Sequence, residues 1–409
     1  MTTTTASGLS LPSSAPAAAR TVFRLLRSLR VGTLDVQLPD GEQLHFAGDM
    51  QGDAPRASLR LLDWAVCRAA LKGGDIGFAE AYIGGHWTSP DLVALLQLFI
   101  ANRDAVEQMI YGTWWGSLAY RIKHLLHRNS RRGSKKNIHA HYDIGNPFYR
   151  LWLDETMNYS SALFEGDATR PTAAAQRAKV HRALRECALK PGQRVLEIGC
   201  GWGALAEAAA RDFGVHVTGL TLSTEQLAFA RERMERQGLQ ALADLRLQDY
   251  RDVPDGPFDA IVSIEMFEAV GREYWRGYFQ TLRDKLKPGG RACIQSIVIR
   301  DDLFERYVRG TDFIQQYIFP GGLLPSPQAF RDEARRAGLE ICNELAFGND
   351  YAETLRRWRV QFLARDHQVR QLGFDTRFMR IWEFYLAYCE AAFATGNTDV
   401  MQFTLRRPG

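Results

Sequence analysis

Two glutamates, Glu265 and Glu268, stand three residues apart directly after an apolar run that ends at Ile264. Their neighbours are Ile, Met, Phe and Val, and a carboxylate in such surroundings is costly unless it is hydrogen-bonded or paired. Carboxylates placed in this way can accept a proton or stabilise a positive charge. Glu265 can equally well cap the helix that follows, so Glu268 is the stronger candidate for a site residue.

A glycine-rich turn is the second feature that could take part in chemistry, as a ligand-binding site. The apolar run Arg194–Ile198 contains Glu197 and is followed by Gly199, Gly201 and Gly203. Glycine permits positive φ and close approach of the backbone to a ligand, and strand, tight turn and helix start in this order are typical of nucleotide sites. The spacing differs from the G-x-G-x-x-G of dinucleotide binders, and the acid suits a ligand that carries an amine. The pattern resembles the first motif of S-adenosylmethionine (SAM) dependent methyltransferases; the alternative is a glycine-rich turn of another α/β protein.

Polar residues also follow the next two expected strands. Ligands of parallel sheets bind at the carboxyl ends of the strands, so these residues are candidates for holding the ribose and adenine of SAM. Together with Cys200 in the glycine turn, the candidates are Thr221, Leu222, Gln226, Gln248, Asp249 and Tyr250. Each is also compatible with an ordinary loop or cap, and Ser223 and Thr224 are good N-caps. Their joint occurrence favours SAM more than the glycine turn does alone.

Hydrophobic periodicity predicts the elements that position these residues. Strands alternating with helices predict a mostly parallel sheet with helices on both faces. The expected strands are Arg194–Ile198, His216–Leu220, Asp244–Leu247, Ala260–Ile264 and Arg291–Ile299, and the expected helices are Ala204–Arg211, Thr224–Gln237 and Tyr274–Leu286. We expect Pro288, Gly289 and Gly290 to end the third helix. The alternating run Asp399–Leu405 can return as an antiparallel strand.

The first hundred residues have a different pattern. Val22–Val31 places arginines three apart between apolar residues, which predicts a short basic amphipathic helix. This helix can dock with a solvated basic face or contact a membrane, and the pattern favours neither. Residues 32–48 alternate around Pro39, Asp40 and Gly41 and predict a hairpin. Helical patterns then continue to about residue 111, broken at paired glycines.

Between Glu107 and Asp143 the chain carries no acidic residue but many lysines and arginines, together with Trp114, Trp115 and Tyr120. Part of this segment is typical of a solvated linker. Cations beside tryptophans also suit a lipid surface, where they meet phosphates and the headgroup boundary. RNA binding would use the same residue types, but no nucleic-acid module is recognisable. We therefore favour a lipid surface and expect no nucleic-acid partner.

Composition sets broader limits. A chain of 409 residues predicts two domains, and a net charge of +4 does not argue for nucleic acid. The six cysteines are scattered without a C-x-x-C pair, which predicts reduced thiols and no zinc or other metal site. No apolar run is long enough to span a bilayer, and the Thr-, Ser-, Ala- and Pro-rich start lacks the pattern of a signal peptide. We expect a disordered tail over residues 1–20 and a cytoplasmic protein.

Several motifs in order resemble the cyclopropane fatty acid synthase family, which includes the mycolic acid cyclopropane synthases. The motifs lie at residues 141–146, 157–160, 199–203, 266–271, 317–325 and 385–389, with a weaker likeness at residues 77–87. The resemblance implies a Rossmann-like class I methyltransferase fold plus a smaller N-terminal α+β lipid-binding domain. It divides the chain into a tail (1–20), a lipid-binding domain (21–120), a basic linker (121–140) and a catalytic domain (141–409).

The resemblance also implies roles for individual residues. Tyr159 and Ser160 would contact the methionine end of SAM, with Gly199 and Gly201 beneath it, while Thr221, Gln226 and Tyr250 would hold the ribose and adenine. Family members carry a bicarbonate ion as the base, and its positions here read Ser161, Glu268, Gln295, Ile297 and Tyr351. Serine and glutamine stand where the family has cysteine and histidine. Cys389 matches a cysteine long regarded as active, although a buried structural thiol explains it equally well.

An alkene has no proton to remove before attack, so positioning of the sulfonium methyl is the first requirement. Attack moves positive charge to carbon, which calls for aromatic faces and carboxylates; the candidate rings are Phe267, Tyr317, Phe319 and Tyr351. The cation then loses a proton. Gln295 cannot act as an imidazole does, and Glu265 adds a second carboxylate that can serve as base or counter-charge. A carboxylate beside bicarbonate would repel it.

These expectations combine into a peripheral membrane methyltransferase at the inner face of the cell membrane. It would act with SAM on the cis double bond of phospholipid acyl chains and produce cyclopropane chains. A methylene or methyl branch is the second product. A reductase or oxidoreductase partner is compatible with a methylene product, and a homodimer is compatible with the chain. The rivals are methylation of a small oxygen or nitrogen nucleophile and a SAM-binding regulatory protein without turnover.

Overall fold

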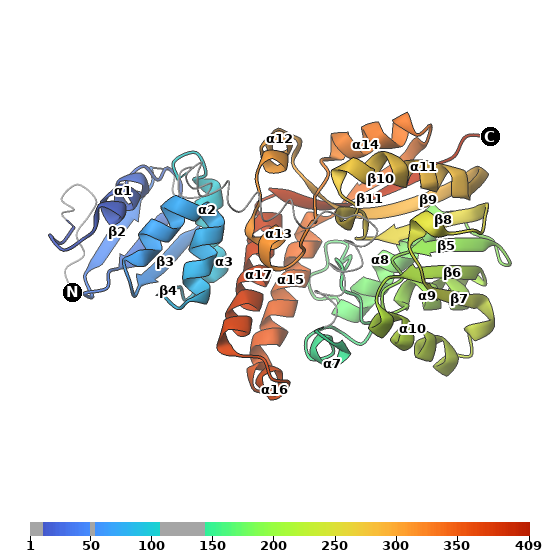
Figure 1. Ribbon diagram of the computed structural model, residues 1–409, viewed down its shortest axis with the longest axis horizontal. Coiled ribbons are helices and arrows are strands. Elements are labelled where there is room, and N and C mark those ends of the chain that lie inside the picture. Colours follow the sequence, from blue (N-terminus) through green and yellow to red (C-terminus); the bar gives the residue numbers. More distant parts are fainter. Residues whose placement is uncertain (1–10, 50–53, 107–143) are drawn as a thin grey trace. The chain divides into compact units, whose positions relative to one another are not determined.

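The computed structural model describes residues 11–49, 54–106 and 144–409, arranged in two compact units (Figure 1). Of the described residues, the N-terminal unit contains 11–49, 54–106, 309–318 and 373–395, and the Rossmann-like unit contains 144–308, 319–372 and 396–409. The expected domain 141–409 therefore contributes two segments to the N-terminal unit. The whole basic stretch 107–143, with the expected linker 121–140, lies outside the described residues.

A seven-stranded sheet forms the centre of the Rossmann-like unit, in the order β10-β11-β9-β8-β5-β6-β7. Its strands are β5 (Arg194–Ile198), β6 (His216–Thr221), β7 (Ala243–Leu247), β8 (Phe258–Ile264), β9 (Leu286–Ile299), β10 (Glu340–Ala346) and β11 (Thr398–Arg406). Strands β5 to β9 are parallel, and β11 runs antiparallel to both β9 and β10. The predicted parallel sheet and the antiparallel return are confirmed. Strand β9 begins at Leu286, so Pro288 lies inside the strand and not between helix and strand.

Helices cover both faces of this sheet (Figure 1). Successive strand residues point to opposite faces: Val195 and Ala260 pack with α8, α9 and α10, whereas Leu196 and Ile261 pack with α11 and α14. The helices of the unit are α7 (Asn146–Tyr149), α8 (Thr172–Glu186), α9 (Ala204–Phe213), α10 (Thr224–Arg236), α11 (Trp275–Lys285), α12 (Asp301–Arg309), α14 (Pro327–Arg336), α15 (Gly348–Ala364) and α16 (Asp366–Gln371). Both faces of the sheet are covered by helices, as is usual for a mostly parallel sheet.

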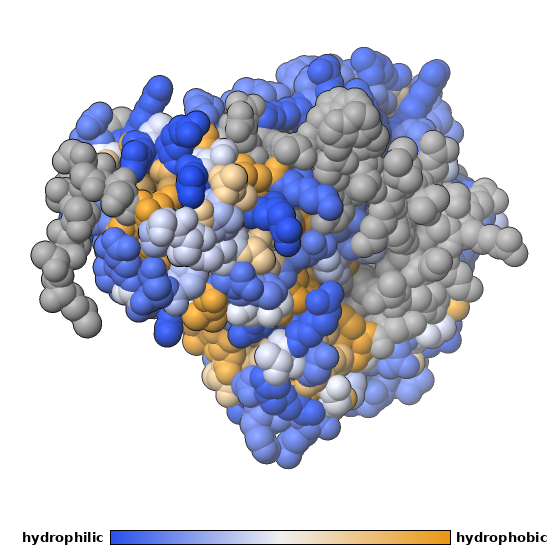
Figure 2. All heavy atoms as spheres, turned by 60° about the vertical axis from the view of Figure 1, so that its left-hand side comes forward, coloured by the Kyte–Doolittle hydropathy of each residue, from blue (hydrophilic) through white to orange (hydrophobic). Residues whose placement is uncertain are grey.

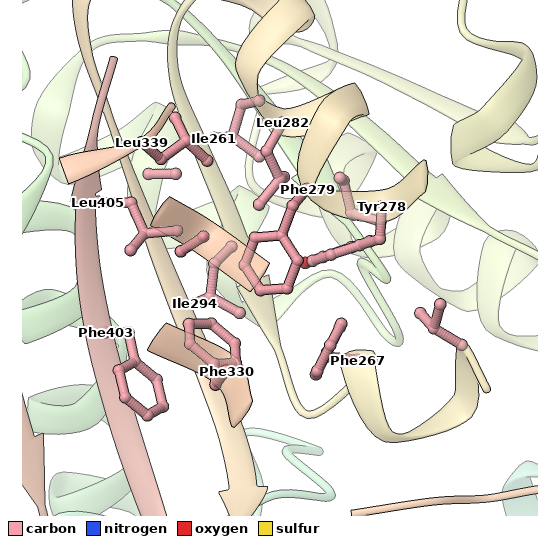
Figure 3. Packing of buried hydrophobic residues seen from close by; sticks show 14 of the residues in the cluster. Ile261, Phe267, Tyr278, Phe279, Leu282, Ile294, Phe330, Leu339, Phe403 and Leu405 are labelled. Atoms are coloured by element: carbon pink, nitrogen blue, oxygen red, sulfur yellow. The ribbon is translucent and has the colours of Figure 1, made fainter. Parts of the chain in front are cut away.

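The core under α11 and α14 is rich in aromatic rings (Figure 3). Phe330 of α14 stacks on Phe403 of β11 with 4.0 Å between ring centroids. Phe279 of α11 meets Phe330 edge-on at 4.9 Å. Offset and edge-to-face rings of this kind add stability beyond the area they bury, so this side of the sheet is a rigid support for the strand ends.

The N-terminal unit contains a four-stranded sheet in the order β2-β1-β3-β4. Its elements are α1 (Ala17–Leu26), β1 (Thr33–Gln37), β2 (Gln43–Ala47), β3 (Arg56–Leu61), α2 (Ala65–Ile83), β4 (Trp87–Thr88), α3 (Leu92–Ala101), α13 (Phe313–Tyr317) and α17 (Thr376–Ala394). Strands β1 and β2 form the predicted antiparallel hairpin. Residues 309–318 and 373–395 are grouped with this unit. In the second of these segments, the ring centroid of Phe384 lies 5.6 Å from that of Tyr82 in α2.

The basic helix differs in extent from the prediction. It begins after Pro16, a residue favoured at helix starts, and ends at Leu26, so residues 17–20 of the expected tail are helical. It ends early because Asn102 Oδ1 accepts hydrogen bonds from the backbone N–H groups of Arg30 and Val31, at 2.7 and 3.0 Å. The apolar face of the helix is buried and its arginines are exposed.

Candidate active site

The glycine turn joins β5 to α9, and its three glycines have positive φ, at 88° (Gly199), 50° (Gly201) and 82° (Gly203). A Cβ on Gly203 would lie 2.9 Å from the Cβ of Ala230, so this glycine lets two helices pack closely. A Cβ on Gly201 would meet no described protein atom within 4 Å. Gly201 therefore leaves open space on the side of the turn where a ligand can approach, which fits the expected SAM.

Glu197 lies at the end of β5 and is only 3% exposed. Its Oε2 has no hydrogen-bond partner among the described residues. Burial raises the pKa of this carboxyl to about 8, and the nearby Lys179 ammonium acts in the opposite direction. A buried oxygen without a partner is an atom that the ammonium or a hydroxyl of a ligand can satisfy.

The ends of β6 and β7 also carry the predicted polar residues. Thr221 Oγ1 donates to Gln226 Oε1 at 3.0 Å, which ties the strand end to the start of α10. The side chain of Ser223 caps α10 by accepting a hydrogen bond from the backbone N–H of Gln226, so the prediction of Ser223 as an N-cap is confirmed. Gln226 is nevertheless held at the carboxyl edge of the sheet, where a ribose would lie.

Beyond β7, the side chains of the predicted adenine site are partly engaged within the protein. Asp249 forms an ion pair with Arg251 at 2.6 Å, and Gln248 Nε2 donates to the carbonyl of Asp252 at 2.8 Å. Tyr250 packs edge-on against Tyr278, and burial raises the pKa of the Tyr250 hydroxyl to about 12. Tyr250 thus offers a neutral ring beside the sheet edge.

An aromatic cluster surrounds Tyr159. Its ring centroid lies 5.4 Å from Tyr149, 5.5 Å from Trp152 and 5.4 Å from Trp358. Tyr159 is partly exposed, whereas the other three rings are buried. Aromatic faces attract cations, most strongly where water is excluded. Tyr159 was predicted from the sequence, but Trp152 and Trp358 were not, since nothing in the sequence shows that a tryptophan of α15 contacts residue 159.

The carboxylate of Glu265 is held by three donors from three separate segments. Its Oε1 accepts the backbone N–H of Ser161 at 2.8 Å and Nε2 of Gln295 at 2.7 Å, and its Oε2 accepts the hydroxyl of Tyr351 at 2.6 Å. Glu265 does not act as a helix cap, which was the alternative for this residue. Its backbone has φ 48°, an uncommon value for a residue other than glycine. The hydrogen bonds hold the side chain at the end of β8 in spite of that cost.

Glu268 lies one turn further on and is also partly buried. Its Oε1 accepts hydrogen bonds from the backbone N–H of Ile297 and from Ser296 Oγ. Its Oε2 is buried without a hydrogen-bond partner among the described residues. Burial, and then the charge of Glu265, raise the pKa of the Glu268 carboxyl to about 8. Neighbouring carboxylates in such a site share a proton and divide the roles of acid and base.

Gln295 is oriented by a hydrogen-bond chain between strands. Gln402 is its register partner on β11 and donates from Nε2 to Gln295 Oε1 at 2.9 Å. Arg182 in turn donates to Gln402 Oε1 at 2.5 Å. These contacts leave Nε2 of Gln295 facing Glu265, so the amide presents a donor to the carboxylate. Gln295 was predicted as a site residue from the sequence, whereas Gln402 was not.

Lys179 of α8 is a site residue that the sequence analysis missed. Its side chain is fully buried, and its Nζ donates to Ser160 Oγ. Burial lowers the pKa of the ammonium to about 8, and the charges of Glu265, Asp154 and Glu197 raise it again. Lysines are almost never fully buried unless they are paired. Lys179 therefore supplies the positive charge that balances the carboxylates of β5 and β8.

Three predicted site residues are not among the side chains that hydrogen-bond to Glu265 or Glu268. Phe267 was expected to face the reacting cation but is fully buried among Tyr278, Phe279 and Phe330 (Figure 3), so that expectation was wrong. Tyr317 belongs to the N-terminal unit, where its hydroxyl donates to Glu80 at 2.5 Å. Cys389 also lies in that unit, on α17.

The environment of Cys389 does not activate its thiol. Burial and the nearby Asp312 raise its pKa well above the ordinary value, and a reactive cysteine needs the opposite shift. The structure thus brings together Ser161, Glu265, Gln295 and Tyr351 with Glu268 beside them, and it places Cys389 in the other unit.

Phe267→Ala should lower the free energy of unfolding by about 3–5 kcal/mol, since it opens a cavity in a packed aromatic core. Phe319→Ala, which truncates a partly exposed ring 6.5 Å from Tyr159, should cost less. Urea unfolding of both variants measures the difference. Equal stability of the two variants would place Phe267 outside the core.

Comparisons with known proteins agree with this geometry. Residues 129–403 match the family model described as mycolic acid cyclopropane synthetase. The chain is 41% identical over 354 residues to tuberculostearic acid methyltransferase UfaA1 of Mycobacterium tuberculosis, covering 84% of this chain and 82% of that protein. It is 32% identical over 381 residues to cyclopropane-fatty-acyl-phospholipid synthase of Escherichia coli, covering 91% and 96%.

Among solved structures, the chain resembles mycolic acid cyclopropane synthase CmaA1 complexed with SAH and CTAB, with a TM-score of 0.62 and 32% identity. The match covers 66% of this chain and 98% of that one. The fold is that of a class I SAM-dependent methyltransferase, and SAM is the cosubstrate. Within the described ranges, no helix has the length and apolar character needed to cross a bilayer.

Proposed function

Because the chain belongs to the mycolic acid cyclopropane synthetase family of SAM-dependent methyltransferases, we propose that it methylates the cis double bond of unsaturated phospholipid acyl chains. The observation that carries this proposal is the pair of carboxylates, Glu265 and Glu268, close to the SAM-binding edge of the sheet. An oxygen or nitrogen acceptor needs at most one base for its own proton and leaves no carbocation behind. An alkene acceptor leaves a positive charge on carbon and then loses a proton, so it can use both a counter-charge and a base.

The reaction proceeds in two steps in this site. The π electrons of the alkene form a bond to the methyl carbon, the carbon–sulfur bond breaks, and neutral S-adenosylhomocysteine results. The aromatic cluster around Tyr159 and the charge of Glu265 stabilise the positive charge left on the neighbouring carbon. A carbon–hydrogen bond then breaks and its proton passes to a base. The buried rings limit water, which would otherwise capture the cation.

Two products follow from the same cation. Proton loss from the added methyl gives a cyclopropane, which is supported by the family model and by the name of the E. coli relative. A hydride shift before proton loss gives a methylene branch. That second candidate is favoured by the name of the 41% identical relative. A methylene branch becomes a methyl branch only with a separate reductase.

A phospholipid substrate implies work at a membrane surface. The N-terminal unit supplies suitable groups, since Arg24, Arg27 and Arg30 are all exposed beside the buried face of α1. In Figure 2, which brings this unit forward, hydrophobic patches reach the surface between hydrophilic side chains. Cations and apolar groups together favour peripheral binding to anionic lipid.

Expression in a bacterium that lacks cyclopropane lipids tests the proposal. Mass spectrometry of its fatty acids should show a gain of one CH₂ on monounsaturated chains. Hydrogenation then separates the products, because it saturates a methylene branch more readily than it opens a ring. Unchanged fatty acids, together with turnover of a soluble acceptor by the purified protein, would favour a small nucleophile instead. SAM binding without any turnover would favour a regulatory protein.

A further inference from the structure

Among the described residues, the donors at the positions that would hold the bicarbonate ion implied by the family resemblance already donate hydrogen bonds to glutamates of the chain. Ser161, Gln295 and Tyr351 stand at three of its five positions, and all three donate to the carboxylate of Glu265. The backbone of Ile297, at the fourth position, donates to Glu268, the fifth. An anion placed there would displace Glu265 and add negative charge beside two carboxylates, which is unfavourable. The residues present therefore do not fit the ion.

We propose that Glu265 is the proton acceptor of this enzyme and that its carboxylate replaces the bicarbonate ion. This inference rests on the proposed function for its chemistry. After methyl transfer, a carbon–hydrogen bond of the cation breaks and its electron pair stays on carbon. The proton moves to a carboxylate oxygen of Glu265, which becomes a neutral acid and later releases the proton to solvent. Atoms and charges then balance without any further reactant.

The geometry gives Glu265 the features of a base. Its Oε1 carries two hydrogen bonds, but Oε2 carries only that of Tyr351 among the described residues, so a lone pair remains for the proton. Glu265 is a partly exposed residue, whereas Ser161 and Gln295 are fully buried. A group that receives a proton from substrate must be reachable in this way.

The surrounding residues are adapted to a carboxylate that is part of the chain. Gln402 fixes the amide of Gln295 so that its N–H₂ group faces Glu265. The Gln295 amide donates to the carboxylate of Glu265 and does not titrate itself, so it does not compete with Glu265 for the proton. The positive φ of Glu265 is a local cost that persists only where the surroundings over-determine it.

Turnover and ion binding of the full-length protein test the inference. With SAM and vesicles of dioleoyl phospholipid, wild-type turnover in CO₂-free buffer should not change when bicarbonate is added. Glu265→Gln should lower turnover about 100-fold or more, the usual contribution of a general base. Glu265→Gly frees the three donors at a backbone position that glycine adopts readily, so added bicarbonate should raise its rate. Glu340→Gln, an exposed glutamate paired with Arg406, is the matched control and should retain full activity.

A binding measurement keeps this inference separate from the proposed function. ¹³C-bicarbonate, followed by NMR line broadening, should bind to Glu265→Gly and not to the wild type. This measurement requires no lipid, so it remains decisive even if no unsaturated chain is methylated. Binding of the ion to the wild type, bicarbonate stimulation of wild-type turnover, or full activity of Glu265→Gln would each overturn the inference.

Discussion

Gly201→Ala should weaken SAM binding by about tenfold or more, which corresponds to at least ~1.4 kcal/mol of binding free energy. Gly201 has φ 50°, and a Cβ added there would meet no described protein atom within 4 Å. The methyl group would instead occupy the open side of the turn, where we expect SAM to approach the backbone. Isothermal titration calorimetry with SAM measures the loss.

Gly238→Ala is the matched control for this variant. Gly238 follows α10 with φ 67°, and its added Cβ also meets nothing within 4 Å. Both substitutions carry the same cost of placing alanine at positive φ, so thermal unfolding should show similar small losses. Only Gly201→Ala should bind SAM more weakly. Equal affinities would mean that SAM does not lie against the glycine turn.

Much of the Rossmann-like unit could be predicted because its signals are local. Strand β5 has the predicted bounds, and the other predicted parallel strands are found with ends shifted by a few residues. Alternation of strands and helices determines a parallel sheet, and the carboxyl ends of its strands then gather the polar residues. The glycine turn was recognisable because glycine adopts positive φ at little cost and lets a ligand approach the backbone closely.

The features of the site and of the N-terminal unit that could not be predicted depend on contacts between segments far apart in the sequence. Glu265 has donors from residues 161, 295 and 351, and no periodic pattern shows that these positions converge. Lys179 stands in an amphipathic helix, where a lysine is normally solvated, and only the fold shows that it is buried. The sequence also gives no local sign that residues 309–318 and 373–395 belong to the N-terminal unit, because that grouping too depends on contacts between distant segments.

Lys179→Met should reduce turnover about 100-fold at neutral pH, an effect of the size expected for loss of a general base. The ammonium favours the ionised form of Glu265, whose pKa burial raises. Without that charge the pKa of Glu265 rises further, and the carboxyl becomes protonated at a pH where the wild type is ionised. Because a protonated Glu265 cannot accept a proton, the acidic limb of the pH–rate profile should move to higher pH. Turnover should partly recover in alkaline buffer.

The pH profile separates this role from a purely structural one. Loss of packing would lower the rate equally at every pH, whereas a charge effect moves the limb. Methionine keeps the length of the buried side chain, so the fold should survive, and circular dichroism can verify it. Lys287→Met removes an exposed lysine paired with Asp259 at 2.7 Å and should leave the profile unchanged. A Lys179→Met profile of wild-type shape, reduced at all pH values, would contradict the electrostatic role, because the charge on Glu265 would then be held by other groups.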